Sequence, residues 1–219
     1  MFASIVPHYD TINSLMTLGL DHRWRCQTVL MAEPHGAVAL DIATGTGELA
    51  FEMMRQGARV VIGADFCVEM LHAATDKAAR TKIGGHVGFI AADAMRLPFA
   101  DNTFDCIVNG FMLRNVDNLR ETFAELCRVL KKGGRLVCLD LTPPQGPLKR
   151  FFAFYIAAFV PLLGVLVAGN YGAYRYLFDS MSVHPDASQV AAMMREAGFA
   201  EVSYKLTGLG TVALHHALK

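Results

Sequence analysis

The hydrophobic positions form short runs of strand length that alternate with helical patterns over much of the chain. Strand-like runs stand at 37–42, 59–64, 86–91, 104–109 and 135–141. Amphipathic helical patterns lie between them, at 48–56, 68–79 and 119–130. Apolar strands that alternate with helices are typical of a parallel sheet covered on both faces. The pattern therefore predicts an α/β core.

Both ends of the chain extend this core. The expected elements are N-terminal helices, then near the C-terminus a helix and two strands, at 1–35, 187–197, 201–206 and 211–218. The last two strands are joined at Gly208-Leu209-Gly210, which predicts a hairpin that closes the sheet. The pair Gly133-Gly134 predicts the turn from the preceding helix into the fifth strand.

Composition narrows the class of protein. The chain has 219 residues, enough for one domain with a substantial core. Twenty Lys and Arg balance twenty Asp and Glu, which argues against a nucleic-acid binder. The mean hydropathy of +0.31 is high and predicts an apolar partner.

The cysteines and histidines give no sign of a metal centre or a disulfide framework. None of the five cysteines forms a C-x-x-C pair, and most stand within apolar runs. We interpret them as small core residues in a reducing compartment. The eight histidines show no H-E-x-x-H spacing, and the N-terminus lacks the basic and apolar regions of a signal peptide.

The stretch 38–50 joins the first predicted strand to the first helix of the core through a glycine turn. Gly45 and Gly47 permit tight backbone geometry. Backbone N–H groups of such a turn, together with the positive end of the next helix, favour a polar or anionic ligand. The spacing also fits the G-x-G-x-x-A pattern of NAD-binding folds, which alone is weak evidence. The stretch predicts a nucleotide-type cofactor.

Carboxylates stand at the ends of three successive predicted strands: Asp41, Asp65 and Asp93. The carboxyl ends of parallel strands form the ligand-binding edge of such a sheet. Asp65 is placed for ribose hydroxyls and Asp93 for an adenine amino group, while Asp41 can meet a cationic amine. Three acids suit a cationic ligand without phosphate, whereas they would repel a pyrophosphate. S-adenosylmethionine fits this description, and NAD is the weaker alternative.

Motifs spread over nearly the whole chain resemble one family. They are Y-D-T-I-N at 9–13, D-I-A-T-G-T-G at 41–47, L-P-F at 97–99, F-M-L-R-N-V at 111–116 and R-V-L-K-K-G-G at 128–134. The second is similar to the D/E-x-G-x-G-x-G motif of class I methyltransferases. The whole set resembles the ubiquinone/menaquinone biosynthesis C-methyltransferases. Departures from the family pattern are Ile12, Asp21, Ala43, Gly110, Met112, Lys132 and Asp140.

The resemblance implies a class I, Rossmann-like α/β fold. Its seven-stranded sheet would be mostly parallel with an antiparallel last strand, beside N-terminal helices and a hydrophobic helical insertion. The implied activity is C-methylation of a prenylated quinol with S-adenosylmethionine, either demethylmenaquinol to menaquinol or the benzoquinol step of ubiquinone biosynthesis. The residues expected at the cofactor are Asp41, Ala43, Gly45, Thr46, Gly47, Asp65, Phe66, Asp93, Ala94, Asn109 and Gly110.

Three alternatives stay open at this point. They are a methyltransferase for another small molecule, an NAD(P)-dependent oxidoreductase and a catalytically silent cofactor-binding subunit of a quinone-synthesis complex. A labelled methyl donor, a demethylated quinol and an NAD titration would separate them.

Methylation of a quinol carbon requires the neighbouring hydroxyl to lose its proton, since a phenol with a pKa of about 10 is mostly neutral at physiological pH. Arg114 is expected to stabilise the phenolate or orient a water, and Asn115 to position the ring oxygen. The alternative for Arg114 is a structural ion pair. Further catalytic candidates are Tyr9, Asp10 and Asp140, for which capping, lid packing or strand-end hydrogen bonding are the alternatives.

The run 151–169 carries no charged residue over nineteen positions, which is long enough to cross a membrane. The favoured interpretation is an apolar cap that receives the isoprenoid tail and touches the bilayer. Two core helices or a true span are the alternatives. The single domain 1–219 then divides into a lid, a cofactor-binding core, a cap and a C-terminal helix with two strands, at 1–35, 37–142, 143–185 and 186–219. A cytoplasmic location, peripheral on the cytoplasmic membrane, and a homodimer are further expectations.

Overall fold

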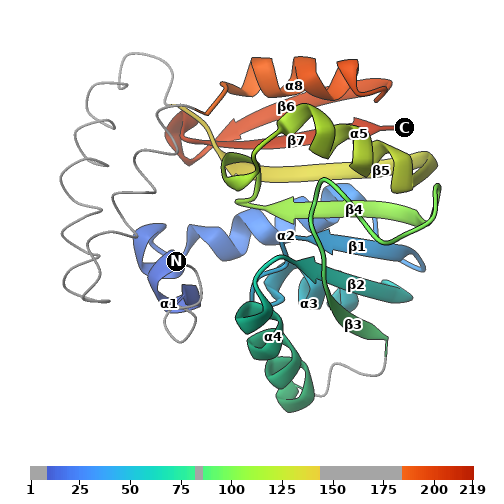
Figure 1. The fold of residues 1–219 in the computed structure, drawn as a ribbon. Coiled ribbons are helices and arrows are strands. Elements are labelled where there is room, and N and C mark those ends of the chain that lie inside the picture. The colour runs from blue at the N-terminus through green and yellow to red at the C-terminus, as the bar shows by residue number, and fades with distance from the viewer. Residues whose placement is uncertain (1–8, 82–85, 144–183) are drawn as a thin grey trace.

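The computed structural model describes residues 9–81, 86–143 and 184–219, which form one sheet flanked by helices (Figure 1). Within these residues seven strands follow the order β3-β2-β1-β4-β5-β7-β6. Their bounds are β1 (Val38–Ile42), β2 (Val60–Asp65), β3 (Val87–Ala91), β4 (Phe104–Gly110), β5 (Leu130–Leu141), β6 (Glu201–Thr207) and β7 (Val212–Leu218). The first five pair in parallel, and β7 runs antiparallel between β5 and β6. The predicted sheet, with its closing hairpin, is confirmed.

The helices connect the strands much as the periodicity indicated. The described ones are α1 (Tyr9–Met16), α2 (Leu20–Ala32), α3 (Glu48–Arg55), α4 (Val68–Thr81), α5 (Leu119–Val129) and α8 (Ala187–Glu196), with short 3₁₀ helices η2 (Leu113–Asn115) and η3 (Gly208–Gly210). Side-chain caps start two of them: Asn118 accepts from backbone N–H groups of α5, and Asp186 does so for α8. These caps explain why both helices begin at the expected positions.

Alternating side chains of the strands feed cores on opposite faces of the sheet. Ile107 of β4 packs in a cluster with Phe123 of α5 and Met194 of α8. Its neighbour Val108 belongs to a cluster that contains Met53 of α3 and Val29 of α2. Successive residues of a strand point to opposite faces. Helices α5 and α8 therefore cover one face, and α2 and α3 cover the other.

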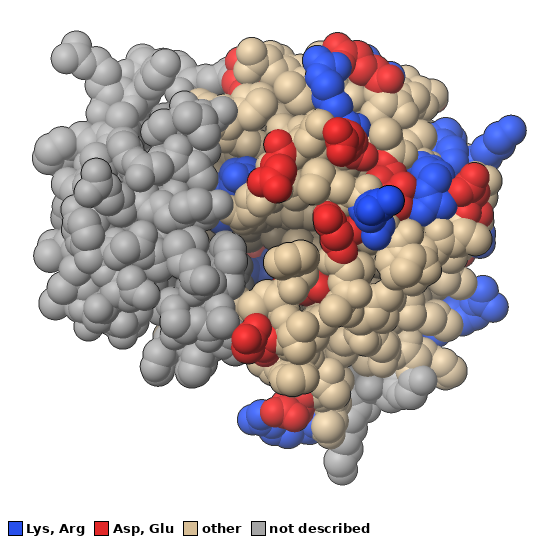
Figure 2. Space-filling view, viewed as in Figure 1, with Lys and Arg blue, Asp and Glu red and all other residues tan. Residues whose placement is uncertain are grey.

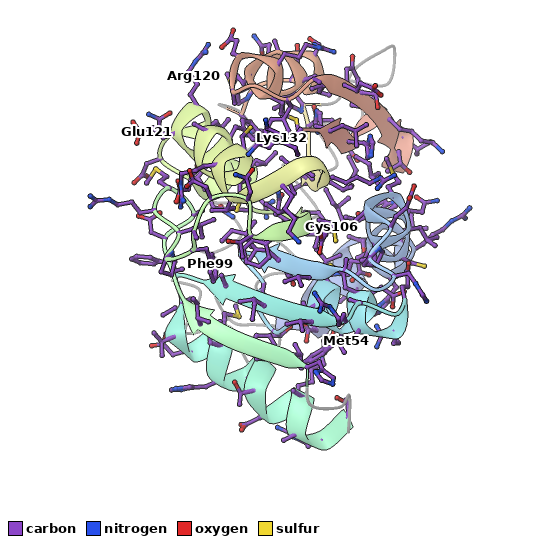
Figure 3. The ribbon with its side chains drawn as sticks, turned by 90° about the vertical axis from the view of Figure 1, so that its right-hand side faces the viewer. Met54, Phe99, Cys106, Arg120, Glu121 and Lys132 are labelled. Carbon is purple, nitrogen blue, oxygen red and sulfur yellow. The ribbon has the colours of Figure 1, made fainter. Side chains whose placement is uncertain are left out.

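The helices of one layer are also joined at the surface. Arg120 of α5 forms an ion pair with Glu196 of α8. In Figure 3, Arg120 lies toward α8 at the upper end of the molecule, whereas Glu121 of the same helix points outward. Both side chains of this pair are largely exposed, so its contribution to stability is small.

One predicted boundary is wrong. The fifth strand was expected at 135–141, with Gly133-Gly134 as a turn before it, but β5 begins at Leu130 and includes both glycines. The pairing of β4 with β5 shifts register here, and Gly133 has a φ of 75°. The glycines therefore form a bulge inside a longer strand.

The predicted apolar cap at 143–185 lies almost wholly outside the described residues, as does the uncharged run 151–169 within it. Of the helices that the structure describes, none combines the length and the apolar character needed to cross a membrane.

Candidate functional site

A cavity of about 330 Å³ lies at the carboxyl ends of β1, β2 and β4. Figure 2 shows a hollow near the centre of this face, with acidic side chains around it. This edge is where open α/β sheets bind ligands. The predicted residues that line the cavity are Ala43, Gly45, Asp65, Phe66, Asp93, Ala94, Gly110 and Asn115. Residues from four separate segments of the chain thus meet at the expected place.

Asp65 connects the end of β2 to the glycine loop. Its carboxylate accepts hydrogen bonds from the N–H of Gly45 at 2.7 Å and from that of Cys67 at 2.8 Å. Burial raises the pKa of Asp65. Each carboxylate oxygen can accept a second hydrogen bond, and the side chain lines the cavity. Asp65 can therefore hold the loop and bind a diol at the same time.

Phe66 offers an aromatic surface at the rim of this cavity. Its side chain is 84% exposed, although large apolar residues of this kind are usually buried. Asp93 lines the same cavity and accepts the N–H of Met95 at 2.9 Å. An exposed ring and a hydrogen-bonding loop that line one cavity suit a flat heteroaromatic ligand.

Asp41 does not line the cavity; it is fully buried beneath the glycine loop. Its Oδ2 accepts from the hydroxyl of Thr44 at 2.6 Å and from the N–H of Ala50 at 2.9 Å. Its Oδ1 has no hydrogen-bond partner among the described residues. Burial raises the pKa of Asp41 to about 7. This carboxyl group therefore ties β1 to the start of α3.

The loop itself has left-handed backbone at three positions. Ala43 has a φ of 57°, Gly45 of 55° and Gly47 of 87°. A Cβ at Gly47 would lie 2.9 Å from the ring of Phe51, so a larger residue would force a shift. Ala43 stands where the methyltransferase motif has glycine, and it adopts the conformation that glycine would take more easily.

Thr46 and Asp10 join the N-terminal helix α1 to the glycine loop. The hydroxyl of Thr46 donates to Asp10 at 2.7 Å, and Lys77 of α4 donates to the same carboxylate at 3.1 Å. Lys77 also pairs with Glu48 at the start of α3. We call Asp10, Thr46, Glu48 and Lys77 the Asp10 cluster. Tyr9 begins α1, but its side chain lies outside the part of the chain that the structure describes.

At the end of β4, Asn109 and Gly110 differ in their position relative to the cavity. Asn109 is fully buried and donates to Sγ of Cys138 at 3.0 Å, so it supports the strand. Gly110 lines the cavity, and a Cβ there would lie 3.0 Å from Leu49. Of these two predicted residues, only Gly110 can contact a ligand directly in this arrangement.

Helix η2 separates the first cavity from a second one of about 370 Å³. Asn115 lines the first cavity, whereas Arg114 lines the second. Arg114 donates to Asp140 at 2.7 Å, which is the ion pair raised above as an alternative. Asp140 also accepts the N–H groups of Leu113 and Leu141, at 2.6 and 2.7 Å. The pair thus fixes the guanidinium beside the second cavity.

The charge of the first cavity suits a cation. Asp65, Asp93 and Asp117 line it, and among the described residues no Lys, Arg or His does so. A pyrophosphate placed here would be repelled, whereas a sulfonium and an ammonium would be attracted. The residues present therefore fit S-adenosylmethionine better than NAD.

Comparison with known proteins agrees with this chemistry. Residues 1–219 match the model of the ubiE/COQ5 methyltransferase family. The chain belongs to this family. A demethylmenaquinone methyltransferase of Roseiflexus castenholzii is 42% identical over 224 residues, spanning 100% of this chain and 92% of the relative. One of Thermus thermophilus is 43% identical over 98% of both chains.

A third relative carries the wider name of the family. It is a ubiquinone/menaquinone biosynthesis C-methyltransferase of Desulfotalea psychrophila, 43% identical over 100% of this chain and 89% of the relative. Among solved structures, a methyltransferase of Thermotoga maritima has a TM-score of 0.70 at 19% identity, covering 100% of this chain and 97% of that one. One of Aquifex aeolicus has a TM-score of 0.65 at 18% identity, with 88% of each chain covered. These two share the fold.

Membership of the ubiE/COQ5 family confirms the predicted resemblance, the class I fold and an enzyme that methylates with S-adenosylmethionine. It decides against the NAD(P)-dependent oxidoreductase. The roles of single residues stay predictions.

Several residues of the first cavity were not predicted. They are Ile42, Cys67, Met70, Ala92, Met95, Phe111, Met112, Val116 and Asp117. Phe111 and Met112 lie within the F-M-L-R-N-V motif, so the motif itself marked them. Cys67 and Met70 follow directly on Asp65, where a strand passes into a helix. The position of Cys67 and Met70 next to Asp65, a predicted ligand-binding residue, is the feature of the sequence that could have indicated them.

Proposed function

We propose that this enzyme transfers a methyl group from S-adenosylmethionine to a ring carbon of a prenylated quinol, with demethylmenaquinol as the first candidate acceptor. The benzoquinol of ubiquinone biosynthesis is the second. The observation that carries the proposal is an identity above 40% over the whole chain to relatives named for these reactions. The position of Arg114 beside a second cavity adds a chemical argument.

The first cavity is proposed to hold the cofactor, which supplies an electrophilic methyl group when bound. Asp65 would accept from the ribose hydroxyls, as acids at this position do in dinucleotide folds. Phe66 would stack on the adenine, and Asp93 would meet its amino group beside Ala94. Ala43, Gly45 and Gly110 allow close approach of the ligand to the backbone.

Other predicted cofactor residues would act through the loop. Asp41 holds Thr44 and α3, Asn109 holds the end of β4, and Thr46 links the loop to α1. Gly47 leaves room for Phe51. These are positioning roles in our proposal, because none of these four residues (Asp41, Thr46, Gly47 and Asn109) lines the first cavity.

The acceptor is proposed to lie between the two cavities, at η2. Asn115 would position the ring oxygen from the cofactor side, and Arg114 would stabilise the phenolate from the other side. Asp140 accepts three hydrogen bonds. We therefore propose that Asp140 positions Arg114 and does not act as the base. Asp10, which is paired with Thr46 and Lys77, would fasten the N-terminal lid, to which Tyr9 also belongs.

A turnover assay tests the proposed reaction. The protein is incubated with labelled S-adenosylmethionine and demethylmenaquinol under reducing conditions, with the benzoquinol in a parallel sample. Label should appear in the menaquinol, and Arg114→Ala should keep cofactor affinity but lose most turnover. Absence of methylated product with both quinols would refute the proposed substrate class. Normal turnover of the Arg114→Ala enzyme would refute only the role of Arg114.

The tail of the acceptor and the membrane form a separate proposal. The uncharged run 151–169 is proposed to receive the isoprenoid chain and to touch the cytoplasmic membrane, with Lys149, Arg150 and Arg175 near lipid head groups. The apolar composition supports it. Flotation with liposomes tests it: recovery in the aqueous fraction, with equal methylation of tail-free and prenylated quinol, would refute it. Gel filtration tests the proposed homodimer.

A further inference from the structure

The second cavity contains a histidine that no role proposed above explains. It shares Val116 and Asp117 with the first cavity, so the two spaces adjoin. Its lining residues come from η2 and the chain that follows it into α5, from the two residues His184 and Pro185 before α8, and from Met193 within α8. Arg114 and His184 therefore line the same cavity from different segments of the chain.

His184 is an unusual group to find buried. It is 8% exposed, and no hydrogen bond joins its ring to another described residue. Burial lowers the pKa of His184, so the imidazole is neutral at physiological pH and one ring nitrogen can accept a proton. His184 lines the second cavity, so a ligand bound there can reach the imidazole.

The charged groups near His184 balance one another. Asp140 raises the pKa of His184, and Arg114 lowers it. His215 of β7 also lies close enough for the two rings to interact, and its Nε2 hydrogen bonds with the carbonyl of Ala187 at 2.9 Å. The negative charge of Asp140 would therefore stabilise the protonated form of His184. The positive charge of Arg114 would favour release of that proton again.

We infer that His184 is the catalytic residue that takes the proton from the hydroxyl of the acceptor, while Arg114 stabilises the oxygen anion that results. The inference rests on the proposed quinol substrate. Asp140 is less suited, because the ion pair and two backbone N–H groups occupy it. Asp117 also lines both cavities, but it is exposed to solvent, whereas His184 and Arg114 are shielded from it.

In the proposed step His184 holds the hydroxyl proton only while the methyl group is transferred. The acceptor's O–H bond gives its proton to the imidazole, and its electron pair moves through the ring to the neighbouring carbon. That carbon bonds to the methyl group while the methyl–sulfur bond breaks and leaves its pair on sulfur. The methylated carbon then releases its hydrogen to water as a proton, the ring becomes aromatic again, and the oxygen recovers its proton from His184. The positive charge of the sulfonium is thus balanced by the proton that is released to water.

The test compares His184→Asn with the matched control His22→Asn, which changes an exposed histidine of α2. Turnover is measured with demethylmenaquinol and with the same quinol carrying a ring fluorine that makes its hydroxyl more acidic. His184→Asn should lose about 10²–10⁴-fold in kcat on the parent quinol, as expected for loss of a general base. The loss should be much smaller on the fluorinated quinol, and added imidazole should restore part of the rate.

The controls separate the possible outcomes. Calorimetry with S-adenosylmethionine should give the same affinity for wild type, His184→Asn and His22→Asn, which shows that the fold is intact. If the cofactor affinity of His184→Asn falls together with its turnover, the same measurements are made on His184→Gln, and the turnover of that variant on the two quinols decides whether the inference holds. An equal loss on both quinols, or no loss on either, overturns the inference. If wild type methylates neither quinol, the proposed function has failed before His184 is tested.

Discussion

Arg114 and Asp140 form an ion pair of 2.7 Å in which both side chains are more than nine-tenths buried. The pair joins η2 to the end of β5, two segments that are far apart in the sequence. Two backbone N–H groups share the same carboxylate, so its negative charge is well compensated. The geometry of the second cavity therefore depends on Asp140 even though Asp140 does not line it.

Asp140→Asn should destabilise the fold and misplace Arg114. Removal of one partner of a buried ion pair costs about 3–5 kcal/mol, because the other charge is left uncompensated. Asparagine keeps the shape of the side chain and one carbonyl oxygen, so the expected loss of unfolding free energy lies near the lower end of this range. Urea unfolding measures it. The control is Asp101→Asn, which breaks an exposed pair with Arg128 and should cost under about 1 kcal/mol. Equal losses in the two variants would contradict the structural role.

Asp65→Ala should weaken the binding of S-adenosylmethionine by at least about tenfold. The side chain offers charged acceptors to the ribose and also holds Gly45, and a hydrogen bond to a charged group is worth about 1.5–3 kcal/mol. Calorimetry on the folded variant measures the loss. Asp76→Ala, on the exposed face of α4, is the control and should bind normally. Unchanged affinity of the Asp65→Ala protein would reject the ribose assignment.

Ala43→Gly should leave the protein as stable as wild type or stabilise it by about 0.5–1 kcal/mol. Alanine at a φ of 57° carries a steric cost of about 1–2 kcal/mol, which exceeds the extra chain entropy that glycine loses on folding. Thermal unfolding checks the sign. The control is Ala50→Gly in α3, where glycine should cost about 1 kcal/mol. Similar destabilisation in both variants would show that the loop conformation is relaxed for alanine.

Lys77→Met should loosen α1 without unfolding the core. The Asp10 cluster is partly exposed, so each pair contributes about 0–1 kcal/mol and is weakened by salt. Limited proteolysis near the N-terminus should speed up in the variant, and in wild type it should speed up with ionic strength. Arg55→Met, which removes an exposed pair with Glu52 on α3, is the control. Insensitivity of the wild-type cleavage rate to salt would argue against an ionic attachment.

Much of the sheet was predictable because its signals are local. Apolar runs located β1 to β4 within a residue or two, and the carboxyl ends of those strands placed Asp65 and Asp93 at one edge. The extension of β5 to Leu130 was missed because glycine pairs normally mark turns, whereas register with β4 decides the outcome here. A bulge is defined by a neighbouring strand, which the local sequence does not contain.

The details of the site were less predictable because they depend on tertiary contacts. Asp10 and Thr46 stand thirty-six residues apart, and no periodicity relates them. Arg114 and Asn115 are adjacent in the sequence but line different cavities, since one residue of a 3₁₀ helix turns the side chain by about a third of a revolution. The motif identified both residues, whereas only the fold separated their positions.

The burial of Asp41 should make stability depend on pH. Its pKa in the folded protein is about 7, whereas an exposed aspartate has a pKa of about 3.9. A folded state that retains a proton loses stability as the pH rises from the unfolded to the folded pKa, so the loss is complete only above about pH 7. At about 1.4 kcal/mol per unit, wild type should lose about 2–3 kcal/mol between pH 5 and pH 8 relative to Asp41→Asn, which cannot ionise. Urea unfolding of both proteins at each pH measures this difference, because contributions from His184 and His215 are common to both and cancel. A difference that stays constant with pH would mean that Asp41 is already ionised at pH 5.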